Sequence, residues 1–305
     1  MEIYNQYIVT KLYESLRLEE PKKEKKSFWA TDSEKPLFDL YHEWIGTPPT
    51  NPIEPEKAIM FNAAKMIEIA LIEKLTKLGI TQDLKEQKRI EMTRCGVPIS
   101  GYIDGVFVDG TPLEIKTFYG DYQAQELKAL KPKTSYLKQL AIYMDFLVAK
   151  LGKLIYMDRG TGEMYEFTLT RTGDFTYECC SIKFNLLDTY MRWKMLYENH
   201  IISKIEPTSE FKYKYPLELI TQAPKSVIAL ARNNRAVYGD WQVKYSPYKN
   251  LIISREGTTV GYSEEEIKKI KELTDGYTSR KTPYENKKVD KLANELMRVI
   301  NNNPL

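Results

Sequence analysis

Two acidic side chains and a lysine stand inside a segment that otherwise has the composition of a buried β-hairpin. Asp104, Glu114 and Lys116 occur in GYIDGVFVDGTPLEIKT, residues 101–117, where β-branched residues flank an Asp-Gly turn sequence. A buried carboxylate is costly unless it is paired, hydrogen-bonded or bound to a cation. Two converging carboxylates suit Mg²⁺ or Mn²⁺, and a neighbouring lysine can orient or help to deprotonate a water, or neutralise a pentacovalent phosphate. The chemistry indicated is phosphodiester hydrolysis.

The length of the hairpin connection decides whether the three side chains meet. Residues two apart in a strand share a face, so Glu114 and Lys116 point the same way. A two-residue turn would place Asp104 opposite Ile115, on the other face, whereas a three-residue connection at 109–111 places it opposite Lys116. We expect the longer connection, with a bulge at its glycine. In the alternative, Glu114 and Lys116 pair on the solvated face of an edge strand and Asp104 is a turn residue.

The elements that must position these residues form an alternating series. The pattern predicts helices at 56–78, 134–150 and 174–199, and strands at about 86–94, 99–108 and 112–118 with two more within 152–170. The order helix, three strands, helix, two strands, helix indicates an α/β (mixed α+β) fold with a central mixed β-sheet flanked by helices.

The chain divides into three predicted parts. Residues 1–55 are mixed helix and loop packing on the core, and residues 56–204 are the core itself. Residues 205–305 form an irregular C-terminal extension, rich in Lys and Tyr, with helices at 263–274 and 285–300.

Composition narrows the class of protein. The 305 residues, 42% of them hydrophobic, can bury a sizeable core. Lys+Arg 45 against Asp+Glu 42 leaves a formal charge of +3, so a phosphate-binding surface requires local clustering. The three cysteines lack disulfide or metal spacing, which favours a reduced compartment. With no apolar block for a signal peptide or a membrane span, we expect a cytoplasmic protein, in the host cell if it is viral, and no membrane partner.

Three segments carry a resemblance to a known family. The segments GYIDGV…PLEIKT, YLKQLAIYMDFL and GKLIYMDRGTGE resemble the RecB-like branch of the PD-(D/E)XK nucleases, which includes CRISPR-associated exonucleases and many phage nucleases. The family's Asp falls on Asp104 and its (D/E)XK motif on Glu114-Ile115-Lys116. The resemblance covers roughly residues 55–170 and implies a restriction-endonuclease-like core.

The family's helical QxxxY motif falls on Gln139 and Tyr143. These residues are spaced i,i+4 and project from one helix face, with Tyr136 and Phe146 nearby. Alone, such a stripe is typical of core packing. The resemblance implies that Gln139 and Tyr143 lie beside the metal site and contact DNA or order the active site.

One acid lies on the apolar stripe of the first core helix. Glu68 is the best match to the family's helical metal ligand, and the alternative is a helix-end salt bridge. The predicted stripe consists of Phe61, Ala64, Leu71, Leu75 and Leu78.

The chain departs from the family in its cysteines. Many relatives bind an iron–sulfur cluster through one N-terminal and three C-terminal cysteines. The corresponding positions here hold no cysteine: Ser33, Val243, Ser246 and Leu251 or Ile252. We therefore expect no iron–sulfur cluster, whether or not this match is fortuitous.

The sequence as a whole predicts a Mg²⁺- or Mn²⁺-dependent deoxyribonuclease, an exonuclease on DNA ends rather than an endonuclease. It would act on single-stranded or duplex ends in recombination, repair or phage DNA metabolism, with protein partners from those processes. Asp104, Glu114, the Ile115 carbonyl and Glu68 are the expected metal ligands, and Lys116 orients the water. The main alternative is a catalytically silent DNA-binding or assembly subunit, and another is a nuclease of RNA or branched DNA.

Two Lys/Tyr-rich stretches offer a second contact with nucleic acid. EFKYKYPLELI and WQVKYSPYKN interleave cations with aromatic rings, as a groove that follows a backbone and stacks bases would. The same composition also covers ordinary solvated surfaces.

Overall fold

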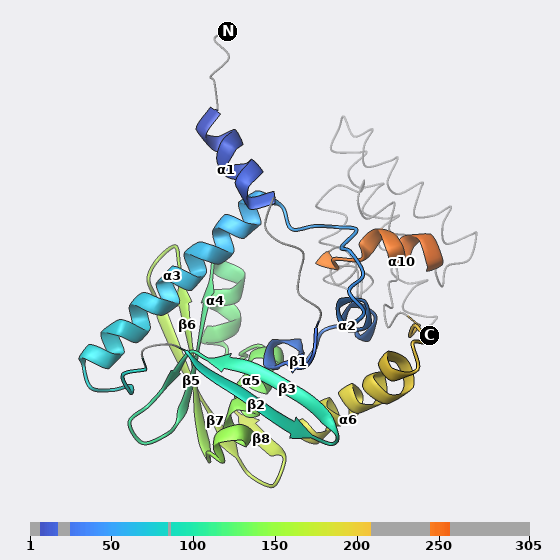
Figure 1. Cartoon of the computed structure of the whole chain (residues 1–305). Coiled ribbons are helices and arrows are strands. Elements are labelled where there is room, and N and C mark those ends of the chain that lie inside the picture. Colours follow the sequence, from blue (N-terminus) through green and yellow to red (C-terminus); the bar gives the residue numbers. More distant parts are fainter. Residues whose placement is uncertain (1–6, 18–24, 85–86, 209–244, 257–305) are drawn as a thin grey trace, which may run out of the picture. The chain divides into compact units, whose positions relative to one another are not determined.

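The computed structural model describes residues 7–17, 25–84, 87–208 and 245–256 (Figure 1). The chain divides into two compact units, residues 1–47 with 53–207, and residues 48–52 with 208–305. The predicted helices at 263–274 and 285–300, and the stretch EFKYKYPLELI, lie outside the described residues. The division into three parts stays a prediction.

Two β-sheets form the centre of the first unit. The strands are β1 (Phe28–Trp29), β2 (Lys88–Arg94), β3 (Val97–Ile103), β4 (Gly105–Val106), β5 (Pro112–Phe118), β6 (Leu151–Asp158), β7 (Met164–Arg171), β8 (Thr176–Cys179) and β9 (Ile182–Asn185). The small sheet has the order β1-β3-β2 and the large sheet the order β4-β5-β6-β7-β8-β9. Strands β5 and β6 are parallel and the other pairs of the large sheet are antiparallel, so the sheet is mixed, as predicted.

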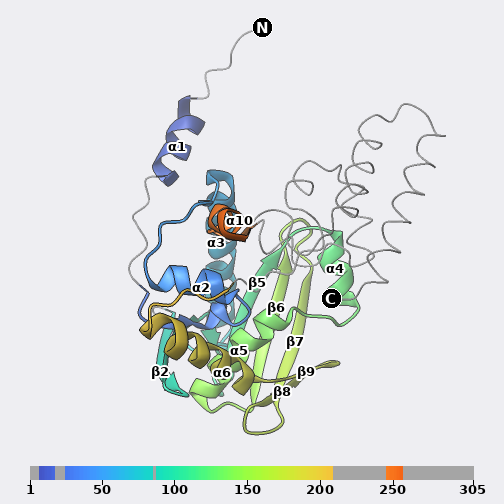
Figure 2. The ribbon, with the colours of Figure 1, turned by 90° about the vertical axis from the view of Figure 1, so that its right-hand side faces the viewer.

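Helices flank these sheets (Figure 2). The helices of the first unit are α1 (Tyr7–Arg17), which contacts α3, the 3₁₀ turn η1 (Ala30–Asp32), α2 (Leu37–Trp44), α3 (Pro55–Lys77), α4 (Asp121–Lys128), α5 (Thr134–Leu147), α6 (Leu186–Leu196) and the π-helical turn η2 (Tyr197–Ile202). Helix α10 (Lys249–Glu256) belongs to the second unit. The predicted mixed α+β class, with a mixed sheet between helices, is confirmed. None of the helices described here has the length and apolarity that crossing a membrane requires.

Helix α5 is held closely against the large sheet. It lies in the crossover between the parallel strands β5 and β6 and packs on both of them. Gly152 of β6 allows this approach, because a Cβ at that position would lie 2.7 Å from Met144 Sδ and 3.0 Å from Leu140 Cγ. The helix that carries Gln139 and Tyr143 is thereby fixed beside β5, the strand that carries the acid and the lysine.

Helix α3 turns the predicted stripe inward over its middle but not at its two ends. Phe61 and Leu78, expected in the buried stripe, are each 60% exposed. The half-buried residues include three members of the predicted stripe, Ala64, Leu71 and Leu75, together with Ile67, Glu68 and Ile72. Apolar residues occur all around this helix, so its periodicity does not mark where the buried stripe begins and ends. Glu68 nevertheless stays on the inward side, and Ile72 packs against Gly105 of β4, where a Cβ would lie 2.7 Å from Ile72 Cδ1.

The long helix predicted from residue 174 is wrong in its first half. Residues 176–185 form the hairpin β8–β9, in which Tyr177 and Cys179 are buried while Glu178 between them is exposed. Helix α6 begins only after Asn185, whose side-chain oxygen accepts the Leu187 N–H at 3.0 Å as an N-cap. The alternating burial of period two and this cap outweigh the helical pattern read from the sequence.

Candidate active site

Asp104 lies where the chain passes from the small sheet to the large one. Strand β3 ends one residue before it and β4 begins one residue after it, so its own backbone belongs to neither ladder. The side chain is almost fully buried and accepts two hydrogen bonds. Oδ2 accepts the Ile115 N–H at 2.8 Å, and Oδ1 accepts from Gln87 Nε2 at 3.0 Å. The carboxylate is therefore tied to the middle of β5.

Residues 107–111 connect β4 to β5, and the loop at the tip of this connection has three residues, but not the predicted three. Phe107 N–H donates to the Thr111 carbonyl at 2.8 Å and closes a loop of residues 108–110. Gly110 has a φ of 90°, in the left-handed region that favours glycine. The predicted connection at 109–111 is thus displaced by one residue.

The displaced loop changes the partner of Asp104 but not its face. Gly105 pairs with Leu113, and one further residue in this register brings Asp104 level with Glu114 rather than Lys116. A three-residue loop at 108–110 and one at 109–111 both leave Asp104 on the same face of the sheet as Glu114 and Lys116. Asp104 and Glu114 accordingly lie side by side at the edge of β5.

Glu114 and Lys116 form an ion pair inside the protein. Glu114 is 0% exposed, and Lys116 Nζ contacts its Oε1. Glu114 Oε2 is buried without a hydrogen-bond partner among the described residues. The Lys116 ammonium also lies 5.1 Å from the centroid of the Tyr136 ring, within cation–π range. The lysine is held between a carboxylate and an aromatic ring, and one oxygen of Glu114 remains unused.

Helix α5 contributes a hydrogen-bonded pair to the same place. Gln139 Nε2 donates to the Tyr143 hydroxyl oxygen at 2.9 Å, and both side chains are buried. Burial and the nearby Glu114 carboxylate raise the pKa of Tyr143 well above its usual value. Tyr143 therefore keeps its proton, which it can donate to an acceptor in the site.

A cavity of about 230 Å³ brings these residues together. Its lining includes four of the predicted site residues, Asp104, Lys116, Gln139 and Tyr143. Glu114 lies behind this lining, in contact with Lys116. The cavity is also lined by residues that the sequence did not single out, namely Trp29, Ala30, Thr31, Lys65, Gln87, Gly101 and Tyr102.

Glu68 reaches the site only through a side-chain amide. Its Oε1 accepts from Lys65 Nζ at 2.6 Å and from Gln87 Nε2 at 2.8 Å, and the same Gln87 nitrogen donates to Asp104. Gln87 therefore joins the two carboxylates. Sequence reasoning missed it because a lone glutamine before a strand carries no motif.

The surroundings of Asp104 and Glu114 disfavour the charged forms of their carboxyl groups. Burial raises the pKa of Asp104 well above its usual value, and the Glu114 and Glu68 carboxylates add to this, against the opposing effect of Lys116. Burial also raises the pKa of Glu114, again opposed by Lys116. Burial disfavours the charged form of Lys116, but the two neighbouring carboxylates outweigh it and raise its pKa. Lys116 thus brings one positive charge to the two carboxylates of Asp104 and Glu114, so part of their negative charge is not neutralised by it.

These residues fit a hard divalent cation. No group of three or more His, Cys, Asp or Glu side chains within residues 7–17, 25–84, 87–208 and 245–256 is arranged to hold a metal ion. Mg²⁺ needs no such group, because it binds through one or two carboxylates and keeps several waters. The unused Glu114 oxygen and the excess negative charge are what such an ion would satisfy.

Because the buried charge of Glu114 is unfavourable, removing it should stabilise the fold. Glu114→Gln should raise the melting temperature of the metal-free protein, because it removes a buried charge and keeps an oxygen for Lys116. A gain of about 1 kcal/mol would correspond to about 2–4 °C by calorimetry in EDTA. Since the pKa of Glu114 is raised in the folded state, the parent loses stability as pH rises from the ordinary glutamate range through that raised value.

The rise in melting temperature caused by Glu114→Gln should accordingly be larger at about pH 7 than at about pH 4. Glu166→Gln is the matched control, because Glu166 pairs with Lys153 on the exposed side of β7 and its loss should change little. A Glu114→Gln protein that melts below the parent at neutral pH would contradict this account of the site.

Comparisons with known proteins give the following. No family model and no curated protein matches the chain. Among solved structures, SSO0001 is similar over 82% of this chain and 96% of its own, at 15% identity and a TM-score of 0.44. An alkaline exonuclease (LHK-Exo) from Laribacter hongkongensis is similar over 65% of this chain and 94% of its own, at 15% identity and a TM-score of 0.39. Its complex with dAMP is similar over 59% and 90%, at 16% identity and a TM-score of 0.36.

Proposed function

We propose that this protein is a Mg²⁺- or Mn²⁺-dependent DNA nuclease whose active centre is Asp104, Glu114 and Lys116. The observation that carries the proposal is the meeting of a fully buried Glu114, its partner Lys116 and Asp104 beside one cavity. Buried carboxylates with raised pKa and too little counter-charge are typical of functional sites.

Asp104, Glu114 and the Ile115 carbonyl would hold the metal. The Ile115 N–H already faces Asp104, and in an extended strand the N–H and C=O of one residue leave the same edge, so the carbonyl shares that side. Glu68 would act through Gln87 or through a water, since Gln87 already lies between its Oε1 and Asp104. A bound Mg²⁺ or Mn²⁺ supplies charge neutralisation at the phosphate and lowers the pKa of a water.

The other residues act on the water and the phosphate. Lys116 keeps its proton because its neighbouring carboxylates raise its pKa, so it serves as a hydrogen-bond donor and a positive charge rather than as a base. Gln139 and Tyr143 present amide and hydroxyl donors at the same cavity and would orient the substrate.

We further propose that the nuclease acts at DNA ends, in recombination, repair or phage DNA metabolism. This choice of substrate rests on the resemblance of the motifs to those of RecB-like nucleases. Incubation with end-labelled linear DNA and with closed circular single-stranded DNA tests it, in Mg²⁺, in Mn²⁺ and in EDTA. We expect metal-dependent release of label from linear DNA and intact circles. Cleaved circles would assign an endonuclease. DNA binding without cleavage in either metal would instead support the catalytically silent subunit.

A further inference from the structure

The outer face of the small sheet carries an exposed aromatic pair. Side chains of β1 and β3 alternate, so that Phe28, Ile99 and Ile103 are buried inside while Trp29 and Tyr102 point outward, each 39% exposed. The two rings lie with their centroids 5.8 Å apart and their planes tilted by 33°. Large exposed rings beside a candidate active site are not explained by core packing.

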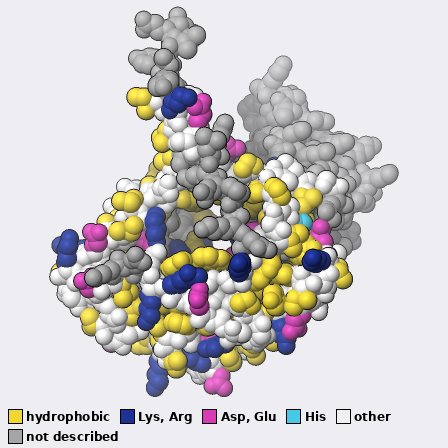
Figure 3. Space-filling view, in the orientation of Figure 1, with side chains coloured by type: hydrophobic (Ala, Val, Ile, Leu, Met, Phe, Trp, Pro, Cys, Tyr) yellow, Lys and Arg dark blue, Asp and Glu magenta, His cyan; other side chains and the backbone are white. Residues whose placement is uncertain are grey.

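Cations surround this aromatic pair. The register places Arg89 of β2 opposite Tyr102. A cavity of about 870 Å³ extends over this face, and its charged lining consists of Lys25, Lys26, Lys35 and Arg89 against Asp32 and Glu43. Viewed from the side of β2 and β3, the surface is hollowed near its centre, with hydrophobic, Lys and Arg side chains at the rim (Figure 3). Lys25 and Lys35 pair with Asp32 and Glu43, and Arg89 pairs with Glu91, so the face combines apolar rings with exposed ion pairs and with the exposed Lys26.

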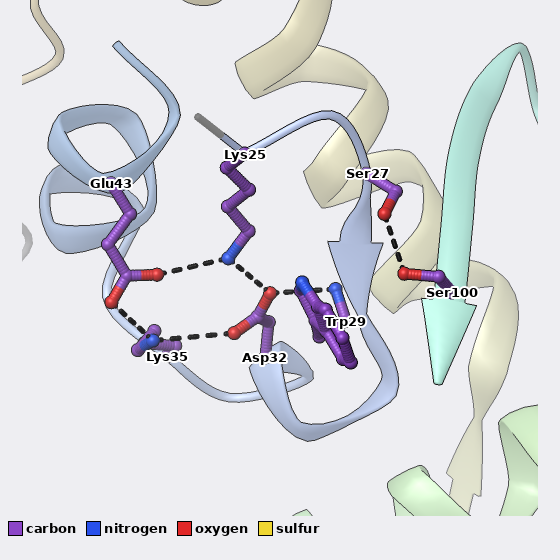
Figure 4. Close-up of polar contacts among 7 residues, drawn as sticks. All are labelled: Lys25, Ser27, Trp29, Asp32, Lys35, Glu43 and Ser100. Atoms are coloured by element: carbon purple, nitrogen blue, oxygen red, sulfur yellow. Dashed lines mark hydrogen bonds and ion pairs between the residues drawn. The ribbon is translucent and has the colours of Figure 1, made fainter. Parts of the chain in front are cut away.

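A buried charge network fixes the position of Trp29 (Figure 4). Asp32 Oδ2 accepts the Trp29 N–H at 2.8 Å and Lys25 Nζ at 2.6 Å. Lys35 and Lys25 each also donate to Glu43, at 2.6 and 3.0 Å. The segment that carries Trp29 is thus tied to α2, which lowers the entropic cost of binding a ligand on the ring.

The aromatic pair is continuous with the candidate active site. Trp29 and Thr31 line both this cavity and the one that contains Asp104. Tyr102 precedes Asp104 by two residues, which in a strand is about 6.6 Å. A nucleic acid strand with a phosphate at Asp104 would place a base on these rings within about two 3.4 Å base steps.

We propose that Trp29 and Tyr102 form a stacking platform for unpaired bases of single-stranded DNA entering the active site, with the exposed Lys26 and Arg89 along the backbone. The proposal rests on the proposed nuclease function for the position of the scissile phosphate. Aromatic faces stack bases of any sequence, but only when those bases are not already stacked and paired in a duplex. The platform therefore selects single-stranded DNA or an unpaired end.

Binding measured without cleavage tests the platform. With a fluorescein-labelled oligodeoxythymidine in EDTA, Trp29→Ala and Tyr102→Ala should each raise Kd at least about fivefold, the range seen for loss of one base–aromatic stack. Trp29→Phe should retain most of the affinity, since a stacking ring remains. Tyr122→Ala is the matched control, because Tyr122 is 77% exposed on α4 and lines neither cavity, and it should bind as the parent does.

The outcomes separate this inference from the proposed function. Folded platform variants that bind single-stranded DNA as tightly as the parent would overturn the platform, even if the parent cleaves DNA. Loss of affinity in both Ala variants, in a protein that cleaves nothing with Mg²⁺ or Mn²⁺, would keep the platform and reject the nuclease. In an active enzyme, Trp29→Ala should raise KM more than it lowers kcat, and equal loss of binding to a blunt duplex would overturn the selection for unpaired bases.

Discussion

Asp104→Ala should lower DNA cleavage by at least about 10³-fold, an increase of about 4 kcal/mol in the activation barrier, while DNA affinity stays equal or improves. The carboxylate is tied to the Ile115 N–H and to Gln87, so its loss removes a metal ligand at the centre of the site. Affinity does not fall, because a negative charge leaves a cavity that must accept a phosphate. Single-turnover cleavage of end-labelled DNA in Mn²⁺ and anisotropy in EDTA measure the two effects.

Asp109→Ala serves as the control for this variant. Asp109 belongs to the same hairpin but is exposed, and its Oδ1 accepts only the Thr111 N–H at 2.9 Å. We expect this protein to cleave DNA as the parent does. A binding module would instead show no metal-dependent cleavage by the parent, and weaker DNA binding on loss of Lys116.

Lys116→Ala should lower turnover by about 10²–10³-fold, the range found for loss of one transition-state hydrogen-bond donor. Its ammonium contacts Glu114 and lies over the Tyr136 ring, so it presents a fixed positive charge at the cavity. Mn²⁺ affinity should be retained or increased, because the lysine competes with the metal for the same carboxylates. Rapid-quench kinetics at saturating Mn²⁺ measure the chemical step.

Lys153→Ala is the control for the lysine. Lys153 lies on the neighbouring strand β6 and pairs with Glu166 at 2.6 Å away from the cavity. Its replacement should leave turnover within about twofold of the parent, as for an ordinary surface ion pair. A Lys116→Ala protein with parental turnover would show that Lys116 has only a structural part in pairing with Glu114.

The part of the site that sequence reasoning found is the part governed by local rules. Alternation along a strand fixes the shared face of Glu114 and Lys116, and the i,i+4 spacing fixes that of Gln139 and Tyr143. The odd length of the loop was enough to put Asp104 on the correct face, although the loop is displaced by one residue. A shift of the loop by one residue leaves its length odd, so the face of Asp104 is unchanged. The residue opposite Asp104 does change, from Lys116 to Glu114.

The site residues that the sequence did not reveal are placed by tertiary contacts. Gln87 joins Glu68 to Asp104 only because α3 packs beside the end of the small sheet. Tyr102 could have been found, since it lies two residues before Asp104 and so shares its face in an extended strand. Its partner Trp29 could not, because the parallel pairing of β1 with β3 joins segments about 70 residues apart and leaves no local pattern.

Binding of Mn²⁺ to the metal-free protein shows whether Asp104 and Glu114 form a metal centre. Free Mn²⁺ gives a six-line electron paramagnetic resonance signal that is lost on binding, so a titration counts the bound ions. We expect at least one bound ion per chain in the parent and in Lys116→Ala, and affinity at least about tenfold weaker in Asp104→Ala. Equal binding of Mn²⁺ by the parent and Asp104→Ala, or none by the parent, would contradict a metal centre at Asp104 and Glu114.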